Sequence, residues 1–241
     1  MNLRRRLLIE WALIALFGTL AVILATHWRG TSAFDNLVYD QLSSLSRPQP
    51  DDQILLINID EASLARIGKW PWNRNIHAQL IDKLAAAGPR TILLDVLMSE
   101  PANATDDNAL ADAMRKSGAV FLPLNFHSPG SDGKAYDTEY PLPTLGAAAK
   151  GVGHVNITFD NDGIVRRVNL CFASDDRRWP HLAELVYRNG SAPSRAFARM
   201  PGCGQDLLLP YAPRDSYSEI SFADALEGGI PEQLVKGRDI I

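Results

Sequence analysis

The fold is decided by the stretch ILLINIDEASLARIGKWPWNR, residues 54–74, which begins with a continuous apolar run over residues 54–59. A run without polar alternation is typical of a strand that is covered on both faces of a sheet. Two further runs of this kind follow, at residues 91–97 and 119–124. Between the runs, apolar residues recur at the spacing of one helix face, which predicts two amphipathic helices.

The first of these helices is expected over residues 74–87, with Asn73 as its N-cap. The second is expected over residues 106–117, with Asp106 as its N-cap. Each helix is followed by a glycine, the residue that most often ends a helix. Alternation of strands and helices predicts right-handed crossovers and therefore a parallel sheet.

The pattern changes beyond a polar loop at residues 127–139. Residues 152–159 and 164–173 flank the sequence Asp160-Asn161-Asp162-Gly163, which predicts a β-hairpin insertion with a glycine-closed turn. The remaining elements are expected to be a helix at 179–189, a strand at 207–211, a short helix at 221–227 and the beginning of a buried strand at 238–241.

Residues 7–28 are almost wholly apolar, and Glu10 and His27 are their ionisable side chains. A transmembrane helix needs roughly 20 such residues. The arginines at positions 4–6 favour a cytoplasmic N-terminus, and one of them is expected to pair with Glu10. The alternative is a signal peptide that is cleaved after Ala33.

The predicted fold class is therefore α/β, a parallel-core mixed sheet with flanking helices and a β-hairpin insertion, preceded by one N-terminal transmembrane helix. The expected organisation is a cytoplasmic N-terminus (1–6), a transmembrane helix (7–28), a juxtamembrane entry helix and linker (29–50) and an extracytoplasmic domain (51–241) that is truncated at its C-terminal end.

Composition excludes several functional classes. The 241 residues carry a net charge of −4, which does not suggest nucleic-acid binding. Two cysteines are too few for a disulfide scaffold or a zinc cluster. Cys171 and Cys203 either form one bridge in an oxidising compartment or stay unpaired. No phosphate-binding glycine loop or ordered Ser–His–Asp pattern is present, so we expect no cofactor, metal or catalytic residue.

Acidic residues lie where the predicted strands end. Asp60 follows the first strand, Asp95 lies in the second, and Glu100 follows it. These ends share one edge of a parallel sheet, where ligands usually bind. The alternative is structural: Asp60 caps a short helix together with Ser63, and Asp95 accepts backbone hydrogen bonds.

Trp70-Pro71-Trp72 is an unusually stiff apolar string, and Arg74 follows it closely. It predicts either the wall and anion-binding group of a pocket or a loop that packs over the sheet edge. Arg166 and Arg167 lie on opposite faces of a predicted strand and bind either a ligand anion or a neighbouring acid. The predicted ligand-binding residues are Asp60, Trp70, Trp72, Arg74, Asp95, Glu100, Arg166 and Arg167.

The order of several motifs resembles the second CHASE family, which consists of extracytoplasmic sensory domains of cyclases and histidine kinases. The resemblance covers about residues 34–241 and rests on the series as a whole. The motifs are Ile59-Asp60-Glu61-Ala62-Ser63-Leu64, Gly68-Lys69-Trp70-Pro71-Trp72-Asn73-Arg74, Leu94-Asp95-Val96-Leu97-Met98-Ser99-Glu100-Pro101, Gly151-Val152-Gly153-His154-Val155-Asn156, Asp162-Gly163-Ile164-Val165-Arg166-Arg167 and Gly237-Arg238-Asp239-Ile240-Ile241.

The resemblance implies a sensor domain of a bacterial inner-membrane receptor, with the residues after 28 in the periplasm. Membrane helices and a cytoplasmic cyclase or kinase module would follow it. It further implies an unknown small-molecule or envelope signal and a homodimer. Two rival hypotheses use the same strand-end carboxylates: a periplasmic metal-dependent hydrolase and a cleaved solute-binding protein.

Overall fold

The computed structural model describes residues 3–27, 32–46, 49–127, 138–174, 177–190, 202–213 and 215–241. The chain divides into two compact units. The first comprises Met1–Pro48 with Pro210–Ala212, and the second comprises Gln49–Leu209 with Pro213–Ile241.

The first unit contains two helices, α1 (Leu3–His27) and α2 (Ser32–Ser46). Within α1, the segment Arg4–Leu24 is long and apolar enough to cross a membrane, a test that a signal sequence near an N-terminus also passes. The Nε atom of Arg6 lies 3.2 Å from Oε1 of Glu10, so the predicted pairing of Glu10 is confirmed. Trp28 and Thr31 lie outside the described residues.

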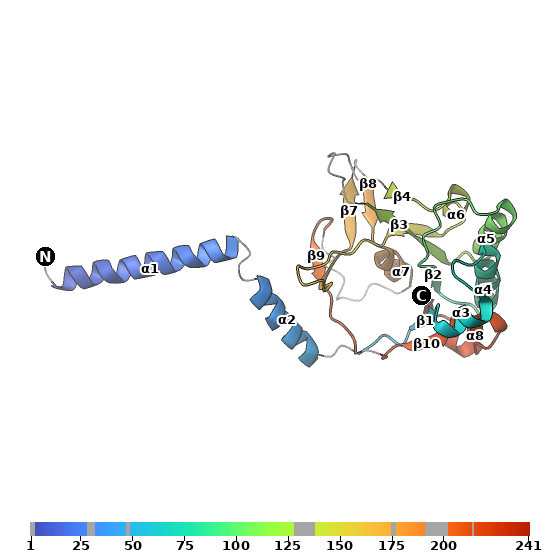
Figure 1. Cartoon of the computed structure of the whole chain (residues 1–241), viewed down its shortest axis with the longest axis horizontal. Helices are drawn as coiled ribbons and strands as arrows, with labels where there is room; N and C mark the ends of the chain where they lie inside the picture. The colour runs from blue at the N-terminus through green and yellow to red at the C-terminus, as the bar shows by residue number, and fades with distance from the viewer. Residues whose placement is uncertain are drawn as a thin grey trace. The chain divides into compact units, whose positions relative to one another are not determined.

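The second unit is built on a mixed sheet of seven strands within the described residues (Figure 1). Its order is β10-β1-β11-β2-β3-β4, and β5 pairs with β3. All these pairings are parallel except that of β3 with β4. The strands are β1 (Ile54–Asn58), β2 (Thr91–Leu93), β3 (Val120–Phe126), β4 (Thr138–Glu139), β5 (Gly151–His154), β10 (Ser218–Ser221) and β11 (Asp239–Ile240).

Helices cover both faces of this sheet. Val120 and Leu122 of β3 belong to the larger core, together with residues of α4, α5 and α8, whereas Phe121 points to the opposite face and packs against α7. The helices of this unit are α3 (Glu61–Ile67), α4 (Arg74–Ala86), α5 (Ala104–Ser117), α6 (Pro143–Gly146), α7 (Leu182–Gly190), α8 (Phe222–Glu227) and α9 (Glu232–Val235).

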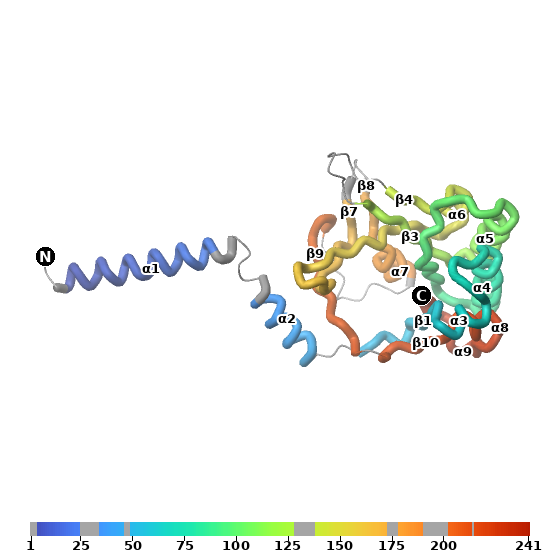
Figure 2. Tube along the Cα trace, in the orientation of Figure 1, coloured from blue at the N-terminus to red at the C-terminus, as the bar shows by residue number. Residues whose placement is uncertain are grey.

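The C-terminal elements complete the domain from the far end of the sequence. In Figure 2, α8 lies beside α3, although about 160 residues separate the Asp60 N-cap of α3 from the Ser221 N-cap of α8. The predicted strand at 238–241 is present as β11 and lies between β1 and β2. Its Asp239 accepts hydrogen bonds from Thr91 Oγ1 at 2.7 Å and Arg90 Nε at 2.9 Å, which anchor β11 to β2.

The predicted fold class is confirmed, but several boundaries were wrong. Helix α5 begins two residues before Asp106, because Asn103 is its N-cap and accepts a hydrogen bond from Thr105 N. Asn73 occupies the N-cap position of α4 without a side-chain hydrogen bond. Strand β2 ends at Leu93, because the chain turns where Val96 N donates to Leu94 O.

The predicted hairpin at 152–173 forms its turn, in which Gly163 N donates to Asp160 O, but its arms pair with each other only near the turn, through one antiparallel bridge between Thr158 and Arg167. Most of each arm pairs instead with a strand that lies outside the predicted hairpin. Strand β5 joins the main sheet, and β6 (Arg167–Asn169) pairs with β9 (Asp206–Leu208). The hairpin that does form joins β7 (Cys171–Ser174) to β8 (Arg177–Pro180). Trp179, predicted to begin a helix, pairs with Phe172 in this hairpin.

Gly153 is required where β5 meets α7. A Cβ atom at this position would lie 2.9 Å from both N and Cα of Leu182, which are backbone atoms that cannot rotate away. We therefore predict that Gly153→Ala lowers the free energy of unfolding by about 2 kcal/mol or more, as overpacking does. Urea denaturation of the chain in detergent micelles measures the change.

Gly146→Ala is the matched control, because its Cβ would meet Pro141 Cγ at an ordinary 3.6 Å. This variant should stay within about 1 kcal/mol of wild type. Equal effects of the two substitutions would contradict the proposed close contact between β5 and α7.

Candidate functional site

A pocket of about 510 Å³ opens beside the N-termini of α4 and α5. Its walls come from the Trp70-Pro71-Trp72 string and from the chain that follows β2, residues 96–98 and 100–103. Four of the eight predicted ligand-binding residues line it: Trp70, Trp72, Arg74 and Glu100. The volume lies in the range of small-molecule sites.

Arg74, which lines this pocket, forms a buried ion pair. The residue is 8% exposed, and its Nη1 atom donates to Oδ1 of Asp107 at 2.7 Å, while Nη2 donates to the carbonyl of Glu100. Oδ2 of Asp107 accepts from Ala102 N at 3.2 Å. The guanidinium therefore ties α4, α5 and the intervening loop together, and its charge is neutralised within the protein.

Aromatic rings form the other wall. The rings of Trp70 and Trp72 meet edge to face with centroids 5.3 Å apart, and Trp72 Nε1 donates to the carbonyl of Gly68 at 2.7 Å. His77 packs against both indoles and against Phe222. Its Nδ1 atom has no hydrogen-bond partner among the described residues. Burial, aided by the charge of Arg74, lowers the pKa of His77 to about 4.

Asp95 lies in a second, smaller cavity of about 280 Å³ between the ends of β1 and β2. Apolar side chains dominate its lining, and His77 and Val96 are shared with the larger pocket. Asp95 is exposed as a residue, yet its carboxyl group lies against this apolar lining, and the resulting desolvation raises its pKa. We place the candidate site in the larger pocket, because four of the predicted ligand-binding residues line it, whereas Asp95 alone of them lines the smaller cavity.

Asp60 lies outside both pockets. It is the N-cap of α3, and its Oδ1 atom accepts hydrogen bonds from Ser63 N, Ser63 Oγ and Ser221 Oγ at 2.8, 2.6 and 2.9 Å. These hydrogen bonds lower the pKa of the Asp60 carboxyl. The geometry matches the structural alternative that the sequence suggested for this residue.

Arg166 and Arg167 also lie apart from the pockets. Arg166 is buried and forms ion pairs with Asp160 at 2.9 Å and Asp162 at 2.8 Å, which close the turn that contains Gly163. The Arg166 guanidinium lowers the pKa of Asp162. Arg167 is exposed on β6. The two arginines therefore face opposite ways, as their spacing in a strand requires.

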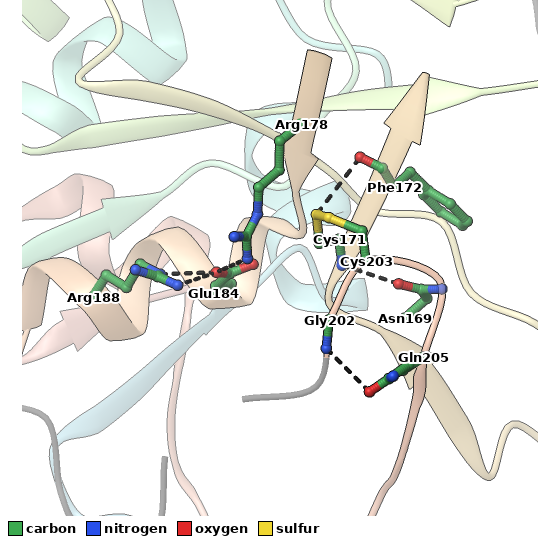
Figure 3. The surroundings of a disulfide bond; sticks show 9 residues. All are labelled: Asn169, Cys171, Phe172, Arg178, Glu184, Arg188, Gly202, Cys203 and Gln205. Atoms are coloured by element: carbon green, nitrogen blue, oxygen red, sulfur yellow. Dashed lines mark hydrogen bonds and ion pairs between the residues drawn. A yellow bond between two sulfur atoms is a disulfide. The ribbon is translucent and has the colours of Figure 1, made fainter. Parts of the chain in front are cut away.

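The disulfide joins Cys171 of β7 to Cys203, with the Cα atoms 4.5 Å apart (Figure 3). Near it, the buried carboxylate of Glu184 accepts from Arg178 at 3.3 Å and Arg188 at 2.8 Å (Figure 3). The bridge closes a loop over a sequence separation of 32, which contains the β7–β8 hairpin and α7. The disulfide is a structural cross-link in the region whose helix α7 packs on the face of the sheet that carries Phe121.

Asp107 and His77 were not among the predicted ligand-binding residues, although the sequence carried a signal for both. Asp107 precedes Leu110, Ala111 and Met114 at helical spacing, so it lies on the buried face of α5. A carboxylate on such a face requires a partner. His77 likewise lies on the buried face of α4, among apolar residues at helical spacing. Both could have been found as polar members of an apolar stripe.

The buried ion pair yields a stability prediction. Asp107→Asn leaves the Arg74 guanidinium buried without its counterion, and we expect a loss of about 3–5 kcal/mol in the free energy of unfolding. Asp112→Asn is the control on the same helix, since the ion pair of Asp112 with Arg115 is exposed and should contribute less than about 1 kcal/mol. Urea denaturation measures both, and similar losses would refute the assignment.

A second prediction concerns pH. His154 is fully buried, its two ring nitrogens lack partners among the described residues, and burial next to His181 lowers its pKa to about 3. Below an unfolded-state pKa of about 6.5, the unfolded chain therefore binds more protons than the folded chain. Stability should fall as pH decreases from about 6.5 to 5, by up to about 1.4 kcal/mol per pH unit for this residue.

His154→Leu should remove about that much of the slope. The free energy of unfolding at several pH values provides the measurement. Identical slopes for wild type and His154→Leu would show that His154 does not titrate in this way.

The model of the CHASE2 domain matches residues 17–241. The match spans most of the chain, which therefore belongs to the CHASE2 family, and the family resemblance of the sequence is confirmed. CHASE2 domains are sensory domains that are typically the extracytoplasmic input of signalling receptors and are generally non-catalytic. Searches of curated proteins and of solved structures found no match.

Proposed function

We propose that this chain is the extracytoplasmic input domain of a bacterial inner-membrane receptor, and that its signal controls a cytoplasmic cyclase or kinase module. The family assignment supports the sensory role. The apolar helix α1, which begins with arginines at positions 4–6, supports anchoring with the domain on the outer side. By resemblance to the family, the receptor acts as a homodimer.

The proposed ligand site is the pocket between the tryptophan string and the N-terminus of α5. The observation that carries this proposal is that Trp70, Trp72, Arg74 and Glu100, which the sequence singled out in two separate segments, line one cavity of ligand size. The pocket also touches two elements that a ligand could move. The loop at 96–103 leads directly into α5, and His77 belongs to α4.

A ligand transmits a signal only if it binds two conformations of the domain with different affinity. Here the Arg74–Asp107 ion pair joins the two helices that border the pocket. A ligand seated against Trp70 and Glu100 would favour one separation of α4 and α5 over another. That change would pass through the sheet to the anchoring helices.

No observation favours the hydrolase hypothesis. Among the described residues, no group of three or more His, Cys, Asp and Glu side chains is placed to hold a metal ion. The cleaved solute-binding protein remains the alternative outcome of the topology experiment below.

Topology is tested by reporter fusions after Ile241 in a Gram-negative host. We expect alkaline phosphatase to be active and green fluorescent protein to be dark at this position, because Arg4–Arg6 hold the N-terminus in the cytoplasm. The intact mass should include α1, and the protein should stay in the membrane fraction. A soluble product beginning near Phe34 would instead support the cleaved protein.

The ligand site is tested by filling the pocket in the full receptor. Ala102 lines the pocket and is exposed, so Ala102→Trp should block the response to signal while the midpoint of thermal unfolding changes by no more than a few degrees. Ala62→Trp, on the exposed side of α3, is the control and should respond like wild type. A normal response from Ala102→Trp would place the ligand site elsewhere.

A further inference from the structure

The charges that face the pocket differ from those that the sequence suggested. Among the lining residues, all of which the structure describes, Arg74 is the permanent cation, and Asp107 neutralises it at 2.7 Å. The acidic residues Glu100 and Asp106 also line the pocket, and no described residue forms an ion pair with either side chain. The residues around the pocket therefore carry net negative charge.

The two tryptophans contribute aromatic surface to the pocket and few hydrogen-bond donors. Because Trp72 Nε1 already donates to Gly68, this indole contributes an apolar surface to the pocket. Trp70 is only partly buried and lies edge to face against it. Indole faces attract cations by about 0.5–2 kcal/mol, more strongly than the faces of other aromatic side chains. A pocket lined by both indoles and acidic residues is thus suited to an organic cation.

His77 is a further polar residue beside the pocket, although its buried Nδ1 atom is closed to solvent. The residue is 1% exposed, lines the pocket, and leaves Nδ1 without a hydrogen-bond partner among the described residues. Its lowered pKa keeps the ring neutral near pH 7, so it does not add a positive charge that would oppose a cation. A neutral imidazole also has one nitrogen that accepts a hydrogen bond.

On the basis of the function proposed above, we propose that the pocket recognises a small organic cation, an amine or ammonium compound with an apolar body. Its charged head would lie between Glu100 and Asp106, and its apolar body would lie against Trp70 and Trp72. The anion suggested by Arg74 in the sequence is disfavoured, because binding it would require Arg74 to leave Asp107.

Three probes of nearly equal size and shape isolate the effect of charge: benzylamine, benzyl alcohol and benzoate. The five tryptophans of the full chain are replaced by 5-fluorotryptophan, and ¹⁹F NMR spectra are recorded in detergent micelles at pH 7. Single Trp→Phe variants assign the signals. Trp179 lies outside the pocket and serves as an internal reference, while Trp11 reports entry of a probe into the micelle.

We expect benzylamine to shift the Trp70 and Trp72 signals with a dissociation constant on the order of millimolar, typical of a fragment. Benzyl alcohol should bind about tenfold more weakly, and benzoate should cause no saturable shift. The double variant Glu100→Gln/Asp106→Asn should lose at least about tenfold in benzylamine affinity. Asp112→Asn, an exposed carboxylate of the same helix, should bind like wild type.

The outcomes separate the ligand class from the ligand site. If benzoate or benzyl alcohol shifts Trp70 and Trp72 more strongly than benzylamine does, the cation proposal fails and the pocket remains the ligand site. If benzylamine binds the double variant as tightly as wild type, recognition by the two carboxylates is refuted. If none of the probes shifts these signals, both the cation proposal and the ligand site are overturned, while the topology experiment still tests the membrane orientation independently.

Discussion

The candidate site depends on the buried ion pair between Arg74 and Asp107. It joins the first residue of α4 to the first turn of α5, and its hydrogen bond to the carbonyl of Glu100 holds the loop between β2 and α5. A buried ion pair adds little net stability compared with a well-packed apolar pair, but removing one member is costly. Its effect is therefore mainly one of geometry, since it holds the two helix ends at one separation and opens the pocket beside them.

The same pair determines the electrostatics of the pocket. An arginine beside two tryptophans suggests an anion site when it is read along the sequence. Because Asp107 neutralises Arg74, the acidic residues Glu100 and Asp106 determine the net charge of the lining. The expected ligand is then a cation and not an anion. Asp60 shows a similar change of role, because Ser63 and Ser221 use its carboxylate to join α3 to the strand and helix near the C-terminus.

The strands and helices of the parallel core could be predicted from sequence because their signals are local. The apolar run at 54–59 and the helical stripe at 74–87 appear in the structure within one or two residues of the expected bounds. The hairpin at 152–173 could not be predicted correctly. Its turn is a local feature and is present, but the partners of its arms are β3 and β9, which lie far away in the sequence. The pattern of neighbouring residues does not indicate which distant strand a given strand will pair with.

By itself, the sequence determined the apolar helix, the α/β class, the family and four of the residues that line the pocket, because periodicity, composition and motif order are properties of neighbouring residues. The tertiary structure alone decided that β11 lies between β1 and β2, that Asp107 pairs with Arg74, and that Asp95 and Asp60 lie outside the main pocket. These facts depend on which segments meet in space. The charge that a ligand encounters also depends on these contacts. A charged side chain attracts a ligand strongly only when no neighbouring side chain neutralises it.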